Sequence, residues 1–328
     1  MSDRIILETR DLTCRFYGKK ALLSRERPFV TAVDGVSLSI RDGETLGLVG
    51  ESGCGKSTLG KAILRLIEPT AGQVLFEGRD MAAASAEELR ALRRELQVVF
   101  QDPYSSLNPR MTAFELVEAP LEVHRIGTKA ERAARVAEML RMVGIDEGSL
   151  HKFPHEFSGG QRQRIGIARA LILGPRFIIC DEAVSALDVS VRAQILNLLR
   201  SLQRQMGLTM LFISHDLSVI RHISDRVAVM YLGSIVELAP KAELYAHPLH
   251  PYTRGLLSAI PIPDVHRVRL DEIPEGEIPD SYHQPAGCKY HNRCPLAQDV
   301  CRRERPALRE ACDGHFVACH LAREKSSE

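Results

Sequence analysis

The stretch from Gly50 to Ser57 reads Gly-Glu-Ser-Gly-Cys-Gly-Lys-Ser and fits the phosphate-binding loop pattern G-x-x-x-x-G-K-[ST]. Glycines let a backbone approach a ligand closely, and a helix that starts behind the loop adds positive potential. We expect Lys56 to reach the β- and γ-phosphates of a nucleotide and the Ser57 hydroxyl to bind Mg²⁺. A glycine-rich turn without a ligand is the alternative. The residues predicted to touch the nucleotide are Gly50, Glu51, Ser52, Gly53, Cys54, Gly55, Lys56, Ser57 and Thr58.

Two adjacent carboxylates end a second apolar run. Residues 177–180 are apolar, and Asp181 and Glu182 follow them. Because ligands bind at the carboxyl ends of parallel strands, we expect Asp181 to hold Mg²⁺ through a water molecule. Glu182 would polarise the water that attacks the γ-phosphate. A solvated acidic turn is the alternative. His215 also follows an apolar run, 208–213, which favours a contact to the γ-phosphate over a surface or capping role.

A second glycine motif lies further along the chain. It consists of Ser158, Gly159, Gly160 and Gln161. These residues precede a predicted helix that runs through Leu171, and the start of a helix is an anion site. A chain whose own Lys56 already holds the phosphates has no need for a second site in the same place. The two motifs together therefore indicate a nucleotide shared between two subunits.

The elements expected around these motifs alternate as in an α/β fold. Residues 45–49 read as a short buried strand before the phosphate loop, and 59–67 as a helix after it. The range 176–238 alternates between strand and helix and ends in a hairpin around Gly233. Residues 105–155 read as a helical insertion.

Local signals place further boundaries. The capping boxes Thr128-x-x-Glu131 and Ser85-x-x-Glu88 predict two helix starts. Lys19 to Val30 reads as an extended loop.

In these motifs the chain resembles the ATP-binding subunits of ATP-binding cassette (ABC) transporters, from about residue 5 to about residue 260 and in the family's order. The resemblance implies an α/β fold, a P-loop NTPase cassette over residues 1–240. Its parts would be a RecA-like core, an antiparallel β subdomain and a helical subdomain at about 105–165. It also implies ATP and Mg²⁺ as cofactors and transport-coupled ATP hydrolysis. Two departures, Phe157 for leucine and Ala183 for proline, lie outside the polar atoms that would touch nucleotide.

The resemblance assigns roles to motif residues. Gln101 matches the glutamine loop, which touches Mg²⁺ and the membrane partner, and His215 matches the switch histidine. The motif 158–161 matches the signature, which binds the γ-phosphate held by the opposite subunit of a head-to-tail dimer.

Two more contacts follow from the resemblance. Asp188 ends the loop Ser185-Ala186-Leu187-Asp188, which crosses the dimer in the family. Either Phe16 or Tyr17 is expected to stack on adenine, and the two adjacent aromatics leave that choice open.

Beyond residue 240 the sequence changes character, and 241–328 resembles the C-terminal extension of the peptide and nickel importer subgroup. His247 and His250 each precede a proline, which favours a rigid turn over metal ligation. Further prolines predict an irregular connector without a packed core, at Pro261, Pro263, Pro274, Pro279 and Pro285.

Five of the eight cysteines lie in this extension, at Cys288, Cys294, Cys301, Cys312 and Cys319. Disulfides are disfavoured, because the ATP motifs place the chain in the reducing cytosol, and the gaps are wider than in most zinc sites. The segment resembles the tail of oligopeptide and dipeptide importer ATPases, where four cysteines are associated with a [4Fe-4S] cluster. Cys288, Cys294, Cys301 and Cys319 match that pattern. An iron–sulfur cluster is favoured, and Zn²⁺ and free thiols are the alternatives.

Composition limits the choice of partners. Lys and Arg number 43 against 42 Asp and Glu, so the net charge of +1 gives no general case for nucleic acid. No apolar run approaches the ~20 residues that span a bilayer, and a secretory signal pattern is missing. We therefore expect a peripheral protein on the cytoplasmic face of the cell membrane.

The expected function is that of the ATP-hydrolysing motor of an importer for peptides or a similar small solute. Its partners would be a second ATPase subunit and two membrane permease subunits. For the second ATPase subunit, a paralogue is favoured over a second copy of this chain. An extracytoplasmic solute-binding protein would act indirectly. The alternative is a soluble cassette ATPase that acts on nucleic acid or ribosomes, although such proteins generally carry two cassettes, coiled-coil insertions or zinc modules.

Overall fold

The structure is a computed structural model, and it describes residues 4–18, 27–102, 106–259 and 284–322. The chain forms two compact units, each described here by itself. The first unit is built mainly from Ala83–Ile213 with Arg41–Glu44. The second is built from Ile5–Ile40, Thr45–Ala82 and Ser214–Glu328.

Parallel strands form the core of the first unit. β7 (Phe177–Asp181) pairs with β6 (Leu96–Val99) and with β8 (Thr209–Ser214), both in parallel. Residues 177–180 are fully buried, as expected for a parallel strand covered on both faces. α2 (Ala86–Glu95) leads into β6, and α7 (Val189–Met206) follows β7. This order brings Asp181 and Glu182 to the carboxyl end of the strands.

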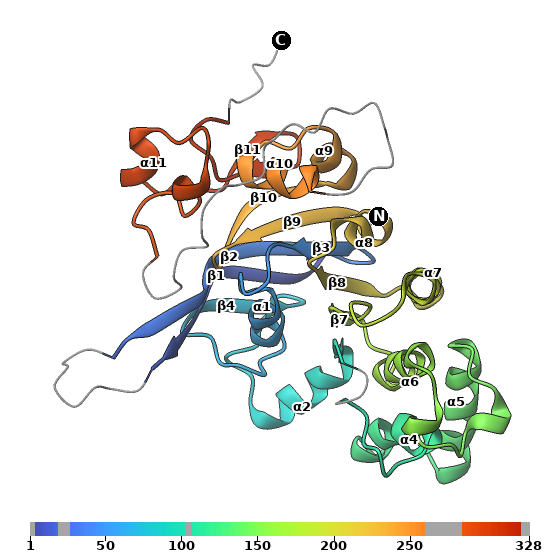
Figure 1. Cartoon of the computed structure of the whole chain (residues 1–328). Coiled ribbons are helices and arrows are strands. Elements are labelled where there is room, and N and C mark those ends of the chain that lie inside the picture. The colour runs from blue at the N-terminus through green and yellow to red at the C-terminus, as the bar shows by residue number, and fades with distance from the viewer. Residues whose placement is uncertain (1–3, 19–26, 103–105, 260–283, 323–328) are drawn as a thin grey trace. The chain divides into compact units, whose positions relative to one another are not determined.

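Three helices of the first unit pack against one another: α4 (Ala113–Val123), α5 (Lys129–Met142) and α6 (Gly159–Leu171) (Figure 1). Short 3-10 turns join them at Glu147–Ser149 and Pro154–Glu156. The predicted helical insertion is confirmed, and both predicted capping boxes are present, at Ser85 before α2 and at Thr128 before α5. Thr112 with Glu115 forms another box before α4 that the sequence analysis did not single out.

The second unit contains the strand that precedes the phosphate loop. β3 (Thr45–Val49) is fully buried and pairs in parallel with β9 (Arg226–Tyr231). α1 (Lys56–Ile63) follows the loop and ends four residues before the predicted end at Ile67. α8 (Leu217–Ile223) precedes β9. The predicted hairpin is confirmed: β9 and β10 (Ser234–Pro240) are joined by Leu232 and Gly233, both with positive φ.

An antiparallel sheet completes the N-terminal part of the second unit. Its strands are β1 (Ile5–Tyr17), β2 (Phe29–Arg41), β4 (Ala71–Phe76) and β5 (Arg79–Asp80), in the order β2-β1-β4-β5. Figure 1 labels the first three of them. This is the antiparallel part implied by the family resemblance. Of the predicted loop from Lys19 to Val30, residues 19–26 lie outside the described residues, and β2 already begins at Phe29.

Within the described residues of the predicted C-terminal extension, 241–259 and 284–322, there are more helices and strands than the sequence indicated. It contains α9 (Lys241–Ala246), α10 (Pro251–Ser258), a 3-10 turn (His291–Arg293), α11 (Asp299–Arg303), β11 (Arg309–Cys312) and β12 (His315–Val317). β12 pairs with β10 and with β11, and Ala311, Val317 and Cys319 form a small core. This core lies at residues 311–319, next to β10, whereas the connector predicted to lack a core is a separate segment. The predicted connector prolines from 261 to 279 lie outside the described residues. The domain boundary at 240 coincides with the end of β10 and stays a prediction.

Candidate functional site

The predicted phosphate loop connects β3 to α1 with a conformation that needs its glycines. Gly55 has a φ of 107°, and a Cβ at this position would lie 2.0 Å from the Ala32 carbonyl oxygen. A Cβ at Gly50 would lie 2.1 Å from the Met230 carbonyl oxygen. Gly53 also has positive φ, where a side chain is strained. The loop therefore turns tightly into the start of a helix, the arrangement that suits an anion.

Lys56 is bound by the loop itself. Its ammonium group donates to the carbonyl oxygens of Gly50 and Glu51, both at 2.8 Å, and only 4% of the residue is exposed. The ammonium also lies 3.6 Å from the Cys54 sulfur, and burial raises the pKa of that thiol. The loop thus holds one buried positive charge and a neutral thiol beside it. Ser57 lies in the first turn of α1.

In the first unit the two carboxylates lie where the strands end. Asp181 closes β7 opposite Ile213, and the Glu182 N–H donates to the Ile213 carbonyl at 3.0 Å. Glu182 has a φ of 49°, a strained conformation for a residue with a side chain. The Gln101 amide donates to the Glu182 carboxylate at 2.7 Å. The structure therefore brings together two residues that sequence separation alone does not connect.

The signature motif forms the start of α6. Ser158 is the N-cap: its hydroxyl accepts from the Gln161 N–H at 3.3 Å, and the Gln161 side chain accepts from the Ser158 N–H at 3.0 Å. Ser158 and Gln161 are exposed. Gly160 lies against Val191, where a Cβ would come within 2.5 Å of a side-chain carbon. The motif is therefore a capped helix start with little space for larger residues.

The structure shows where the remaining predicted contact residues lie, and their roles stay predictions. Asp188 is exposed directly before α7. His215 is exposed after β8, in the second unit. Phe16 and Tyr17 are both exposed at the end of β1, and the Tyr17 ring lies 5.9 Å from that of Phe29. The structure leaves the choice of the adenine-stacking residue open.

The predicted magnesium ligands carry only oxygen donors. Ser57 offers a hydroxyl, Asp181 a carboxylate and Gln101 an amide oxygen. Mg²⁺ usually takes one or two carboxylates and completes its shell with water and substrate phosphates. Within the described residues, no group of three or more His, Cys, Asp or Glu side chains is arranged to hold a metal.

The same finding leaves the predicted cluster of Cys288, Cys294, Cys301 and Cys319 without support as a metal site among the described residues. Burial, with smaller contributions from the neighbouring thiols, raises the pKa of the Cys288 thiol to about 11. Burial also raises the pKa of Cys294. At pH 7 the Cys288 thiol is therefore protonated in the metal-free chain, and a metal would have to displace that proton to bind the sulfur.

The histidines of the extension are placed as the rigid turn predicts. The buried His250 caps α10, and its Nδ1 accepts from the Tyr252 N–H at 3.1 Å. Burial lowers the pKa of His250 to about 4, so the ring is neutral at pH 7. His247 is exposed and lies 3.3 Å from Glu243. The two histidines serve different local contacts.

Two residues that bind the phosphate loop were not predicted from the sequence. The Arg293 guanidinium donates to both carboxylate oxygens of Glu51, at 2.8 and 3.0 Å, and the Glu51 N–H donates to the Tyr252 hydroxyl at 2.9 Å. Both residues belong to the C-terminal extension. The sequence signal for such a contact is Glu51 itself, because a carboxylate in an anion-binding loop calls for a cation from another part of the chain.

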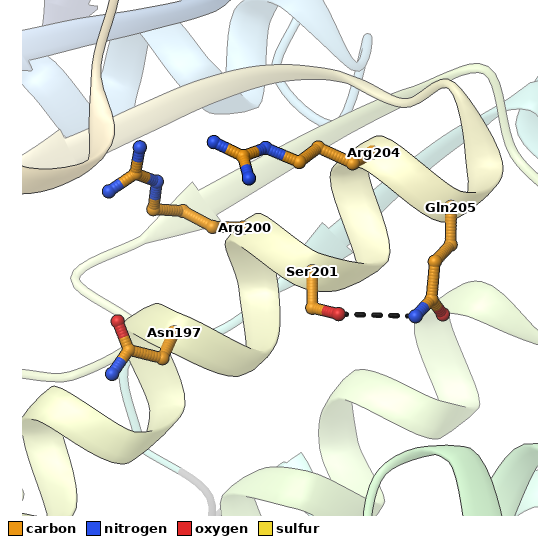
Figure 2. A pocket seen from close by; sticks show the side chains of 5 residues that line it. All are labelled: Asn197, Arg200, Ser201, Arg204 and Gln205. Carbon is orange, nitrogen blue, oxygen red and sulfur yellow. Dashed lines mark hydrogen bonds between the residues drawn. The ribbon is translucent and has the colours of Figure 1, made fainter.

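A separate pocket lies along one face of α7, as Figure 2 shows. It is lined by Asn197, Arg200, Ser201, Arg204 and Gln205. Gln205 donates to the Ser201 hydroxyl at 3.2 Å. All five residues come from one helix, and none belongs to a predicted motif, so we assign this pocket no part in the chemistry. Among the described residues no helix is both long and apolar enough to cross a bilayer.

Comparison with known proteins identifies the family. A model of the ABC transporter family matches residues 33–185, and a model of the oligopeptide/dipeptide transporter C-terminal region matches residues 236–301. The oligopeptide transport ATP-binding protein AppF of Bacillus subtilis (strain 168) is 53% identical over 321 residues, covering 96% of this chain and 97% of the relative. The probable peptide ABC transporter ATP-binding protein y4tS of Sinorhizobium fredii is 53% identical, covering 98% and 91%.

Solved structures agree. The post-hydrolysis dimer of the ATP-binding cassette MJ0796 bound to ADP and Pi has a TM-score of 0.63 and 31% identity, covering 72% of this chain and 98% of that one. The cbiO1 subunit of the cbiONQ transporter complex from Clostridium perfringens has a TM-score of 0.65 and 28% identity, covering 75% and 92%. The chain is an ATPase subunit that belongs to the ATP-binding proteins of ABC transporters, in the group with the oligopeptide/dipeptide transporter C-terminal region.

Proposed function

We propose that this chain is the ATP-hydrolysing motor subunit of an importer for peptides or a similar small solute. The observation that carries the proposal is the joining, in one chain, of an ABC cassette to the C-terminal region matched over residues 236–301. Relatives that match over nearly the whole chain are named as peptide or oligopeptide transport ATP-binding proteins.

Each predicted residue has a role in that motor. The loop around Lys56 binds the phosphates of one ATP, and its buried ammonium supplies a fixed positive charge. Glu182 polarises the attacking water, while Gln101, which donates to its carboxylate at 2.7 Å, orients it. His215 contacts the γ-phosphate. Bound through Ser57, Asp181 and Gln101, Mg²⁺ would neutralise phosphate charge.

The signature explains why two subunits are needed. Ser158 is exposed and Gly159 and Gly160 are half-buried, so this helix start would be available to the ATP held by a partner. Binding of ATP then becomes closure of a head-to-tail dimer, and hydrolysis reopens it. Asp188, the last residue of the predicted crossing loop, is exposed and would face the partner subunit in that dimer.

The proposed partners are a second ATPase subunit, a paralogue more than a second copy, two permease subunits and, indirectly, an extracytoplasmic binding protein. The chain would lie on the cytoplasmic face of the membrane through the permeases. A role on nucleic acid or ribosomes has less support, because the chain has one cassette and a net charge of +1.

Reconstitution tests the import proposal. The chain is co-expressed with its candidate permeases and second ATPase, and the complex is placed in lipid vesicles with ATP on the outside. Addition of the peptide-loaded binding protein inside should raise ATP hydrolysis and move peptide out of the vesicle lumen. If every peptide pool left the rate of ATP hydrolysis unchanged and the chain bound ribosomes tightly, the import proposal would be rejected.

The iron–sulfur cluster and the zinc ion stay predictions, and no step above depends on either. Anaerobic purification followed by iron, sulfide and zinc analysis tests them. A brown protein with broad visible absorption supports the cluster. A colourless protein with stoichiometric zinc supports zinc. A colourless protein without iron, sulfide or zinc supports free thiols.

A further inference from the structure

All three polar groups of Glu51 are bound. Its carbonyl accepts from Lys56 at 2.8 Å, its N–H donates to Tyr252 at 2.9 Å, and its carboxylate accepts from Arg293 at 2.8 and 3.0 Å. Two of these three partners come from the C-terminal extension. The second residue of the phosphate loop is therefore held by the part of the chain that distinguishes this group of cassettes.

The Arg293 contact is a fork, with one nitrogen on each carboxylate oxygen. Only 8% of the Arg293 side chain and 25% of the Glu51 side chain are exposed. Planar two-point pairs of this kind are stronger and more directional than a single hydrogen bond. Water competes little for a pair that is so covered, so the pair fixes both position and charge.

Three tyrosines surround the fork. The Arg293 guanidinium carbon lies 6.0 Å from the Tyr231 ring centre and 5.9 Å from that of Tyr290. The rings of Tyr231 and Tyr252 lie 4.6 Å apart, and those of Tyr252 and Tyr290 lie 5.4 Å apart. All three tyrosines are buried. Rigid aromatic packing therefore positions both the guanidinium and the Tyr252 hydroxyl.

The extension is itself attached through a buried carboxylate. Glu237 on β10 is fully buried and accepts from the N–H groups of Leu249 and His250 and from the His315 ring, which lies at 2.7 Å. His250 in turn accepts from the Tyr252 N–H. These contacts fix α10, which carries Tyr252, to the same sheet that contains β3.

The charge of Glu51 makes this anchoring relevant to ATP. A loop that binds phosphates works through inward N–H groups and a positive lysine. A carboxylate in the same loop opposes a polyanion, and that repulsion is large where water is scarce. Arg293 supplies the missing positive charge at the carboxylate.

We propose that Arg293 is a positioning residue for ATP binding: it neutralises and holds Glu51, so the C-terminal extension sets the affinity of the phosphate loop for ATP. Tyr252 supports the same function by holding the Glu51 N–H. The inference rests on the assignment of the loop 50–57 to ATP and does not depend on peptide import.

A double-mutant cycle on the full-length chain tests the inference, with ATP dissociation constants from titration calorimetry and thermal unfolding in parallel. Arg293→Gln should weaken ATP binding about tenfold, the size expected for an uncompensated charge near an anion. The KM for ATP should rise with it, while kcat at saturating ATP stays within about twofold. Glu51→Gln combined with Arg293→Gln should bind ATP within about twofold of Glu51→Gln alone, because no uncompensated charge remains.

Matched variants separate positioning from folding. Arg305→Gln removes another arginine of the extension, one that pairs with Asp34 at 2.8 Å, and should leave ATP affinity unchanged. Arg293→Lys keeps the charge but loses the two-point contact, so it should recover part of the affinity. The inference is overturned if Arg293→Gln binds ATP as tightly as the parent chain, or if the double variant binds ATP as weakly as Arg293→Gln alone. It is also overturned if Arg305→Gln or Arg293→Lys weakens ATP binding as much as Arg293→Gln does. If Lys56→Ala left ATP binding intact, the loop assignment would fail instead.

Discussion

The Arg293 guanidinium and the Glu51 carboxylate form a two-point ion pair across 242 positions of the chain, with both nitrogen–oxygen distances at or below 3.0 Å. The pair joins the C-terminal extension to the loop that carries Lys56. In this chain the phosphate loop is therefore supported by a residue of the C-terminal extension.

The glycines of the phosphate loop should differ in their tolerance of alanine. Gly55→Ala places a Cβ against the Ala32 carbonyl at a φ of 107°, so it should abolish ATP binding and cost more than about 2 kcal/mol of stability. Gly53→Ala, with a φ of 81° and nothing within 4 Å of the added Cβ, should cost only about 1 kcal/mol. Urea unfolding and ATP titration measure both effects, and equal losses would reject the steric explanation.

His250 should make stability depend on pH. Its pKa is lowered to about 4 by burial, so between the ordinary value near 6.5 and 4 the unfolded chain binds the extra proton. The free energy of unfolding should therefore fall as pH drops through this window, by roughly 3 kcal/mol or less.

A substitution that keeps the cap isolates this effect. His250→Asn retains an oxygen acceptor for the Tyr252 N–H and should remove the dependence. The exposed His247→Asn should leave it unchanged. Chemical denaturation across pH 4 to 7 gives the answer, and the same slope in all three proteins would contradict the assignment.

Two helix caps should separate a structural role from a nucleotide role. Ser158 before α6 and Thr128 before α5 form the same capping box, so alanine at either position should cost about 1 kcal/mol. Only Ser158→Ala should also reduce ATP hydrolysis in the assembled dimer, because only that helix start is predicted to meet nucleotide. Similar losses of activity in both variants would show that the cap alone accounts for the effect.

Local patterns predicted what is local in this fold. The strand before Gly50, the boxes at Ser85 and Thr128 and the hairpin at Gly233 follow from residues within a few positions of one another. The family resemblance added the order of the nucleotide motifs.

Contacts between distant residues could not be predicted in this way. Nothing in the spacing of Glu51 and Arg293 pairs them, and β12, His315–Val317, is too short to show strand periodicity. The small core of Ala311, Val317 and Cys319 is likewise no local feature, because β12 pairs with β10, which lies about 80 positions earlier in the chain.

The central claim is that this chain is a motor driven by ATP at a site shared between two subunits. It depends most directly on the proposed role of Glu182. Its carboxylate accepts from Gln101 at 2.7 Å at the carboxyl end of β7, where a general base is worth about 100-fold or more in rate. The matched control is Glu147→Gln, since Glu147 is an exposed carboxylate paired with Arg141.

The most direct test measures phosphate release and oligomeric state of Glu182→Gln with its partner ATPase in the presence of ATP and Mg²⁺. Hydrolysis should fall at least about 100-fold while an ATP-dependent closed dimer accumulates in size-exclusion chromatography. Glu147→Gln should behave as the parent chain. Hydrolysis at the parent rate in Glu182→Gln, with no change in the dimer, would contradict the assignment of Glu182 and the shared-site mechanism built on it.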